Sequence, residues 1–265
     1  MDGGGRGGSV ELGPSDREAV SRERIAGEAM ALAITKYTFG IVTDHNGVEG
    51  RGIGTGTGVL WRGRRFILTA NHVLADTPRE RLYFFPPVHD PELAEASADW
   101  SGLPLQQRVR FEEGPEILVS ALDDLAAIEL PHLAGEVAAA GFYRLDERAV
   151  TPAIGTPVAY VGYPSDQARI LRGSLSAAPF YNCSEILESK ATFRNYDPER
   201  SFLAGFPSGE EIHARGFSGA GVWYAEPAGE LVLAGIVTDY VERLRILIAR
   251  RAERVVGFFG LTVGD

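Results

Sequence analysis

Three residue types that together activate a serine hydroxyl occur in three separate segments of this 265-residue chain. His72 ends the segment LTANH, Asp124 begins DLAAI, and Ser218 lies within GFSGAG. An uncharged serine hydroxyl is a poor nucleophile near neutral pH. It needs a neutral imidazole to accept its proton and a carboxylate to hold and stabilise that imidazole. These segments therefore indicate acyl-transfer chemistry, in which a hydroxyl attacks a carbonyl carbon.

The order of these residues along the chain restricts the folds that could hold them. Hydrolases of the α/β class carry their histidine after the serine, and no histidine follows Ser218. A subtilisin-like order would use Asp44 as the acid, but the surroundings of Asp44 and Ser218 match that class poorly. A metallopeptidase would need the spacing His-Glu-x-x-His, which the histidines at positions 45, 72, 89, 132 and 213 do not have. With these three classes set aside, the remaining candidates are folds in which the histidine, aspartate and serine follow in that order along the chain.

Composition argues against several other functions. The chain has 36 acidic and 26 basic residues, a net charge of −10, so nucleic acid would be repelled overall. The basic runs at 62–65 and 243–254 are interleaved with apolar residues, and we interpret them as strand or helix surface. The single cysteine, Cys183, excludes an intrachain disulfide and a thiol pair for a metal, and we interpret it as a buried or inert thiol. The glycine-rich run 54–58 lacks the patterns of phosphate-binding loops. We therefore expect no nucleic acid, metal or cofactor.

Neither a membrane span nor a targeting segment is evident. No stretch approaches the roughly 18 apolar residues of a membrane span. The glycine-rich, polar segment 1–10 lacks the apolar centre of a secretory signal. We therefore expect a cytoplasmic protein without a membrane partner.

Short strands separated by turn signals dominate the chain after residue 36. The first group is predicted at 36–43, 56–61, 65–70, 81–85, 108–111, 117–121 and 125–130. The second group is predicted at 158–162, 170–176, 186–189, 202–206, 221–224, 231–238 and 245–248. Repeated short strands without long helices between them indicate an all-β, antiparallel fold.

The two ends of the chain have a different character. Residues 1–20 are glycine-rich with mixed charges and predict a flexible tail. Helical spacing of apolar residues between positions 17 and 34 predicts a helical extension, which we assign to 21–36. The main domain is then 37–265, divided into halves at about 37–145 and 150–250. A closing helix is predicted at 249–260, with Val255, Val256 and Phe259 on its inner side.

Taken in order, the motifs resemble the trypsin-like, chymotrypsin-fold serine peptidases, especially the disulfide-free bacterial type. The matching elements are Thr-Ala-x-His at 69–72, the glycine-rich strand before it at 54–60, Asp-Leu-Ala at 124–126, Gly-x-Ser-Gly at 216–219, and a substrate-pairing strand at 234–238. The resemblance covers about residues 37–260. It implies a chymotrypsin-like, all-β domain of two antiparallel six-stranded β-barrels.

The resemblance also implies a role for each residue. Ser218 would attack the peptide carbonyl, with His72 as general base and then general acid. Asp124 would fix the imidazole tautomer, and Asp123 is the alternative for this carboxylate. The backbone N–H groups of Gly216 and Ser218 would form the oxyanion hole. The implied activity is that of a serine endopeptidase acting on protein or peptide substrates. The alternative is a degenerate member that serves as a protein-binding or scaffold module.

The residues at positions that control activation in the digestive members of that family differ in this chain. Phe217 stands where those enzymes have an aspartate that pairs with a newly cut N-terminus, and Ile41-Val42 is followed by Thr43. We therefore predict that cleavage at Ile41 does not switch the protein on. A regulatory partner could instead bind the N-terminal extension.

The predicted substrate-binding residues come from two segments. Ile212, six residues before Ser218, lies where an acidic residue would select lysine or arginine, so it argues against that preference. His213 and Tyr240 would line or narrow the pocket and favour small or acidic side chains. Val237 and Thr238 would lie on the strand that pairs with the substrate.

Overall fold

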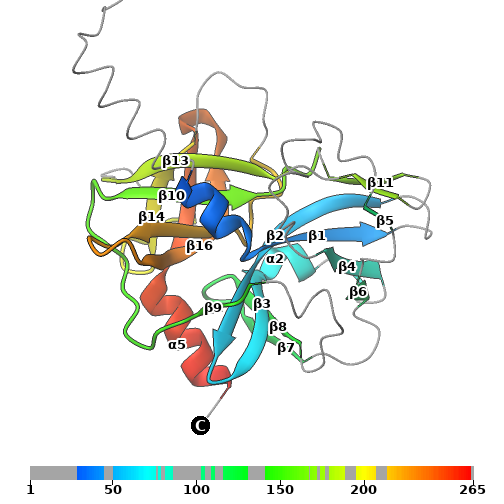
Figure 1. Cartoon of the computed structure of the whole chain (residues 1–265), viewed down its shortest axis with the longest axis horizontal. Helices are drawn as coiled ribbons and strands as arrows, with labels where there is room; N and C mark the ends of the chain where they lie inside the picture. Colours follow the sequence, from blue (N-terminus) through cyan, green and yellow to red (C-terminus); the bar gives the residue numbers. More distant parts are fainter. Residues whose placement is uncertain are drawn as a thin grey trace, which may run out of the picture.

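The computed structural model is built mainly from strands (Figure 1). The structure describes residues 29–44, 50–75, 77–78, 81–85, 103–104, 109–110, 116–130, 141–166, 168–171, 174–176, 179–188, 195–206 and 214–263. Residues 29–35 are helical, within the predicted extension, and the predicted tail lies outside the described residues.

An eleven-stranded sheet, called here the large sheet, takes most of its strands from the first half of the chain. Its strands are β1 (Thr38–Asp44), β2 (Gly50–Trp61), β3 (Arg64–Ala70), β4 (Leu82–Phe85), β5 (Leu103–Pro104), β6 (Val109–Arg110), β7 (Ile117–Ser120), β8 (Leu125–Glu129), β9 (Tyr143–Arg144), β11 (Arg169–Leu171) and β12 (Ser174–Ser176). The long strand β2 pairs with both β1 and β3, and β3 pairs in turn with β8. The short helix α2 (Asn71–Ala75) follows β3 directly.

The second half of the chain forms a closed six-stranded barrel in the order β10-β13-β14-β17-β16-β15. Its strands are β10 (Pro157–Gly162), β13 (Phe180–Leu187), β14 (Ser201–Gly205), β15 (Gly221–Ala225), β16 (Leu231–Val241) and β17 (Ile246–Arg251), and the 3-10 helix η3 (Glu242–Leu244) joins the last two. Every neighbouring pair in this barrel is antiparallel. Aromatic side chains fill its interior, among them Tyr160, Phe206 and Phe217.

The C-terminal helix α5 (Ala252–Thr262) packs against both halves of the molecule (Figure 1, red). The Phe259 ring stacks on Trp61 of β2 at 5.6 Å between centroids and also contacts Phe66 of β3. Val255 and Phe259 are fully buried, as predicted, in a core cluster that also contains Trp223 of the closed barrel. This shared core fixes how the two halves sit against each other.

The all-β, chymotrypsin-like architecture is confirmed, and the structure differs from the prediction in its details. Only the second half forms a closed barrel among the described strands. The large sheet instead contains eleven strands, among them the hairpin β11–β12 of the second half, which pairs with β2. Strand β17 also runs to Arg251, so the closing helix begins at Ala252 and not at residue 249. The reason is that Ala249 and Arg250 are buried and pair with Phe202 and Ser201 of β14.

No described helix is both long enough and apolar enough to cross a membrane. Within the described part of the chain, no group of three or more histidine, cysteine, aspartate or glutamate side chains could hold a metal ion.

Candidate active site

The structure brings His72, Asp124 and Ser218 together from separate elements. The His72 Nδ1 lies 2.8 Å from Asp124 Oδ2, and the His72 Nε2 lies 3.0 Å from Ser218 Oγ. His72 lies in α2, which follows directly after β3 ends at the buried residue Ala70. One continuous line of hydrogen bonds can therefore run from the carboxylate through the imidazole to the hydroxyl.

Asp124 is held against α2 through both its backbone and its side chain. Its carbonyl accepts a hydrogen bond from the Asn71 N–H at 3.0 Å, and its Oδ1 accepts one from the His72 N–H at 3.0 Å. The residue ends the turn between β7 and β8 with a φ of +52°, in the left-handed region. The Oδ2 is thereby left to face the imidazole.

Asp123, the alternative for the carboxylate role, points elsewhere. Its carboxylate is paired with the Arg254 guanidinium at 3.0 and 3.1 Å. The structure therefore brings Asp124, and not Asp123, to His72.

The turn that carries Ser218 depends on two glycines with positive φ. Gly216 has a φ of +99° and Gly219 a φ of +94°. A Cβ on Gly216 would lie 2.2 Å from the Tyr163 carbonyl oxygen, and one on Gly219 would lie 1.9 Å from the Thr55 carbonyl oxygen. Both positions thus require glycine for its backbone conformation and for space.

The N–H groups predicted to form the oxyanion hole lie on this turn. The Gly216 carbonyl is turned toward β2, where it accepts a hydrogen bond from Thr55 Oγ1 at 2.6 Å. Among the backbone hydrogen bonds of the described residues, neither the Gly216 N–H nor the Ser218 N–H donates to a carbonyl. Among the described residues, no backbone carbonyl therefore competes for these two donors.

Two buried threonines of β2 bind the Ser218 turn and a third, Thr69 of β3, supports them; sequence reasoning missed all three. Thr55 accepts a hydrogen bond from the Tyr163 N–H and donates one to the Gly216 carbonyl, and its own N–H donates to the Ser218 carbonyl. Thr57 Oγ1 donates to the Gly219 carbonyl, and Thr69 Oγ1 donates to the Thr55 carbonyl. Threonines alternating with glycines in GTGTG were the available signal, because alternate residues of a strand share one face.

We predict that Thr55→Val weakens both the fold and the site. Valine has nearly the same shape but leaves the buried Tyr163 N–H and Gly216 carbonyl without this partner, which should cost about 1–3 kcal/mol. The free energy of urea-induced unfolding and the acylation rate at Ser218 would measure the two effects. Thr262→Val is the matched control, since its hydroxyl bonds Phe258 at the end of α5. Equal losses in both variants would contradict the prediction.

Three of the five predicted substrate-binding residues lie in the described part of the chain. Val237 lies beside the Ser218 turn, where its N–H bonds the Ala220 carbonyl and its carbonyl accepts from the Gly219 N–H. Thr238 is buried, and its hydroxyl faces the Ile248 carbonyl of β17 at 3.4 Å. Tyr240 is half-buried and packs on the Phe206 ring. Ile212 and His213 lie outside the described residues.

Phe217 is a core residue of the closed barrel. It is fully buried, and its ring meets Tyr160, Phe180 and Phe206 edge to face at 5.5–6.0 Å. Gly162 faces the same ring, because a Cβ there would approach it to 2.5 Å. Phe217 therefore anchors the Ser218 turn to the barrel core.

A cavity of about 1370 Å³ lies between the large sheet and the closed barrel, away from these residues. Its lining includes Tyr37, Trp61, Tyr143 and Tyr224, and none of His72, Asp124 or Ser218. This cavity is therefore separate from the site.

Comparisons with known proteins agree with the fold and with the family resemblance of the sequence. A family model described as a trypsin-like peptidase domain matches residues 56–232. Among solved structures, human heparin binding protein is similar with a TM-score of 0.52 and 14% identity, over 83% of this chain and 87% of that chain. At this identity the likeness concerns the fold. A search of curated proteins finds no match.

Proposed function

Because the chain belongs to the trypsin-like peptidase domain family, we propose that it is a serine endopeptidase that hydrolyses peptide bonds through an acyl-enzyme intermediate. The observation that carries this proposal is the hydrogen-bonded line from Asp124 through His72 to Ser218. A degenerate scaffold module would have no need to keep three polar side chains in this mutual geometry.

The proposed chemistry follows from these contacts. As Ser218 Oγ forms its bond to the peptide carbonyl carbon, His72 Nε2 accepts the hydroxyl proton, and Asp124 stabilises the resulting imidazolium. The imidazolium then protonates the leaving amine, which breaks the peptide bond and leaves the acyl group on Ser218. In the second half of the reaction His72 takes a proton from a water molecule as its oxygen bonds to the acyl carbon. The imidazolium then returns this proton to Ser218 Oγ as the ester bond breaks and the acid leaves. Throughout, the N–H groups of Gly216 and Ser218 would stabilise the negative charge on the carbonyl oxygen.

The substrate would bind in extended form beside β16. The pairing of β16 with β15 ends at Ile236 opposite Gly221, next to the Ser218 turn, whereas β16 itself continues to Val241. A peptide would pair with this edge beyond Val237, whose own N–H and carbonyl bond Ala220 and Gly219, and bring its carbonyl to Ser218. A strand edge without a neighbour among the described strands presents N–H and C=O groups in register.

We propose that the site assembles without cleavage at Ile41. This residue is buried in the middle of β1 and pairs with Gly54 of β2 and Phe84 of β4. A new N-terminus at this position would have to leave the large sheet. The buried Phe217 also offers no carboxylate to receive it.

Cleavage-site profiling on a peptide library tests the proposed activity. We expect the parent to cleave internal bonds after small or acidic side chains and Ser218→Ala to cleave none. Cleavage after lysine or arginine would contradict the assigned specificity but not the activity. A parent that binds peptides and cleaves none would favour the scaffold alternative.

A further inference from the structure

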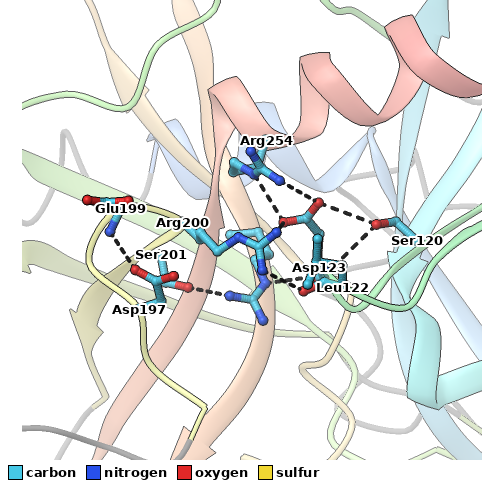
Figure 2. A network of polar contacts seen from close by, with 9 residues as sticks. Ser120, Leu122, Asp123, Asp197, Glu199, Arg200, Ser201 and Arg254 are labelled. Carbon is cyan, nitrogen blue, oxygen red and sulfur yellow. Dashed lines mark hydrogen bonds and ion pairs between the residues drawn. The ribbon is translucent and has the colours of Figure 1, made fainter.

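Asp123 and Asp124 are adjacent in the chain, but their carboxylates face opposite partners. Figure 2 shows Asp123 directed toward Arg254 of α5, with Ser120 on its other side. Its side chain is only 7% exposed, against 27% for Asp124. A carboxylate this deeply buried is normally paired with a cation, and Asp123 has two arginines within reach, Arg254 at 3.0 Å and Arg200 at 3.5 Å.

The same turn is also held through its backbone. Arg250 of β17 donates from Nε to the Asp123 carbonyl at 2.5 Å, and Arg200 donates from an Nη to the Leu122 carbonyl at 3.2 Å. Arg250 is in turn fixed by Ser201 at 2.6 Å. Three guanidinium groups from the second half of the chain thus converge on one turn of the first half.

This convergence bears directly on Asp124. The Asp123 carbonyl belongs to the peptide group just before Asp124, and the Asp124 carbonyl belongs to the one just after it. Arg250 holds the first oxygen, and the Asn71 N–H holds the second. Between them Asp124 adopts its φ of +52°, which non-glycine residues avoid unless their surroundings impose it.

The charges around the turn balance. Arg200, Arg250 and Arg254 face Asp123, Asp124 and Asp197. Burial lowers the pKa of Arg250, and the charges of Asp123 and Asp124 oppose that shift. The hydrogen bonds that Arg254 donates to Asp123 raise the pKa of Arg254. Arginine side chains stay charged in proteins, so their hydrogen bonds to the turn are charge-assisted.

We propose that Arg200, Arg250 and Arg254 form an arginine clamp that positions Asp124 against His72 from the opposite half of the molecule. The inference rests on the proposed function, in which Asp124 orients the imidazole. The three arginines are positioning residues, since they contact the β7–β8 turn and act on the imidazole through it. Through the clamp, the packing of α5 and β17 sets the geometry of the site.

Arg254→Gln tests the clamp, with Arg64→Gln as the matched control. Arg64 makes the same two-bond contact with Glu129, at 2.6 and 2.7 Å, and its side chain is 35% exposed against 38% for Arg254. It lies at the far end of the β3–β8 pair from Asp124. Both variants therefore lose one cation and one bidentate pair, but only Arg254→Gln releases the turn.

The first readout is the titration midpoint of the His72 imidazole, followed by NMR and assigned by its absence in His72→Ala. Removal of a cation alone would raise this midpoint. Displacement of the Asp124 carboxylate removes stabilisation of the imidazolium and lowers it. We expect Arg254→Gln to lower the midpoint by about one pH unit and Arg64→Gln to leave it unchanged or slightly higher. Arg254→Lys, which keeps the charge without the planar fork, should restore it only in part.

The second readout is the rate at which a fluorophosphonate acylates Ser218. We expect a decrease of about 10- to 100-fold in Arg254→Gln, because a shift of about 1 Å in a catalytic group costs on that order, and less than twofold in Arg64→Gln. An unchanged or raised His72 midpoint in folded Arg254→Gln would overturn the clamp. If the variants show the expected shifts of the His72 midpoint but the parent never reacts at Ser218, the proposed function is overturned and the clamp still stands.

Discussion

Asp124→Asn is expected to lower kcat about 10⁴-fold while KM stays nearly constant. In the structure Oδ1 accepts the His72 N–H, and Oδ2 faces Nδ1. An asparagine must keep its oxygen on the N–H, so its amide group would donate to Nδ1. The ring proton would then move to Nε2, and that nitrogen could no longer accept the proton of Ser218. Steady-state kinetics on a cleaved peptide measure the loss.

Asp146→Asn is the control for this substitution. Asp146 also accepts a backbone hydrogen bond through its Oδ1, from the Arg148 N–H at 2.7 Å, but in an exposed turn. We expect its kcat to stay within about twofold of the parent, as for surface positions away from a site. A decrease of less than tenfold in Asp124→Asn would mean that the imidazole does not depend on this carboxylate for its tautomer.

Gly219→Ala is expected to abolish acylation of Ser218 and to destabilise the fold by about 3 kcal/mol or more. The added methyl group would lie 1.9 Å from the Thr55 carbonyl oxygen and 2.2 Å from Thr69 Oγ1, both buried groups of the large sheet. The turn would have to move away from β2 and would lose its hydrogen bond from Thr57. Urea denaturation and the acylation rate measure the two losses.

Gly229→Ala is the control that distinguishes steric overlap at Gly219 from the backbone strain of an alanine at positive φ. Gly229 has a φ of +82°, close to that of Gly219, but a Cβ there would meet nothing within 4 Å. Its substitution should cost only the strain of a left-handed alanine, about 1–2 kcal/mol, and leave the acylation rate unchanged. Equal losses of stability and activity in Gly219→Ala and Gly229→Ala would contradict the prediction. They would mean that close packing on β2 does not hold the Ser218 turn in place.

The residues of the candidate site could be predicted from the sequence because each sits in a short local motif. The match to the family's Asp-Leu-Ala pattern favoured Asp124 over Asp123, and the structure places Asp124 beside His72 and Asp123 beside Arg254. The two glycines around Ser218 likewise carried a local signal, since a tight turn needs residues that adopt positive φ.

The long-range contacts that hold these residues could not be predicted in the same way. Arg250 and Arg254 lie more than 120 residues after Asp123, as their separations of 127 and 131 show. In the sequence they belong to a basic run that we interpreted as strand or helix surface. Burial of Arg250 in β17 depends on the pairing of β14 with β17, which no local pattern specifies. Local motifs thus indicated the candidate site residues, and only the fold shows which residues support them.

Fluorophosphonate labelling with the site mapped by mass spectrometry is the most direct test of the proposed activity. The reagent forms a bond from phosphorus to the attacking oxygen and releases fluoride, so it reports an activated serine without any knowledge of the natural substrate. We predict a single adduct on Ser218 in the parent, and none in Ser218→Ala or His72→Ala. Absence of an adduct on folded parent at any pH, or an adduct that persists in Ser218→Ala, would contradict the proposal.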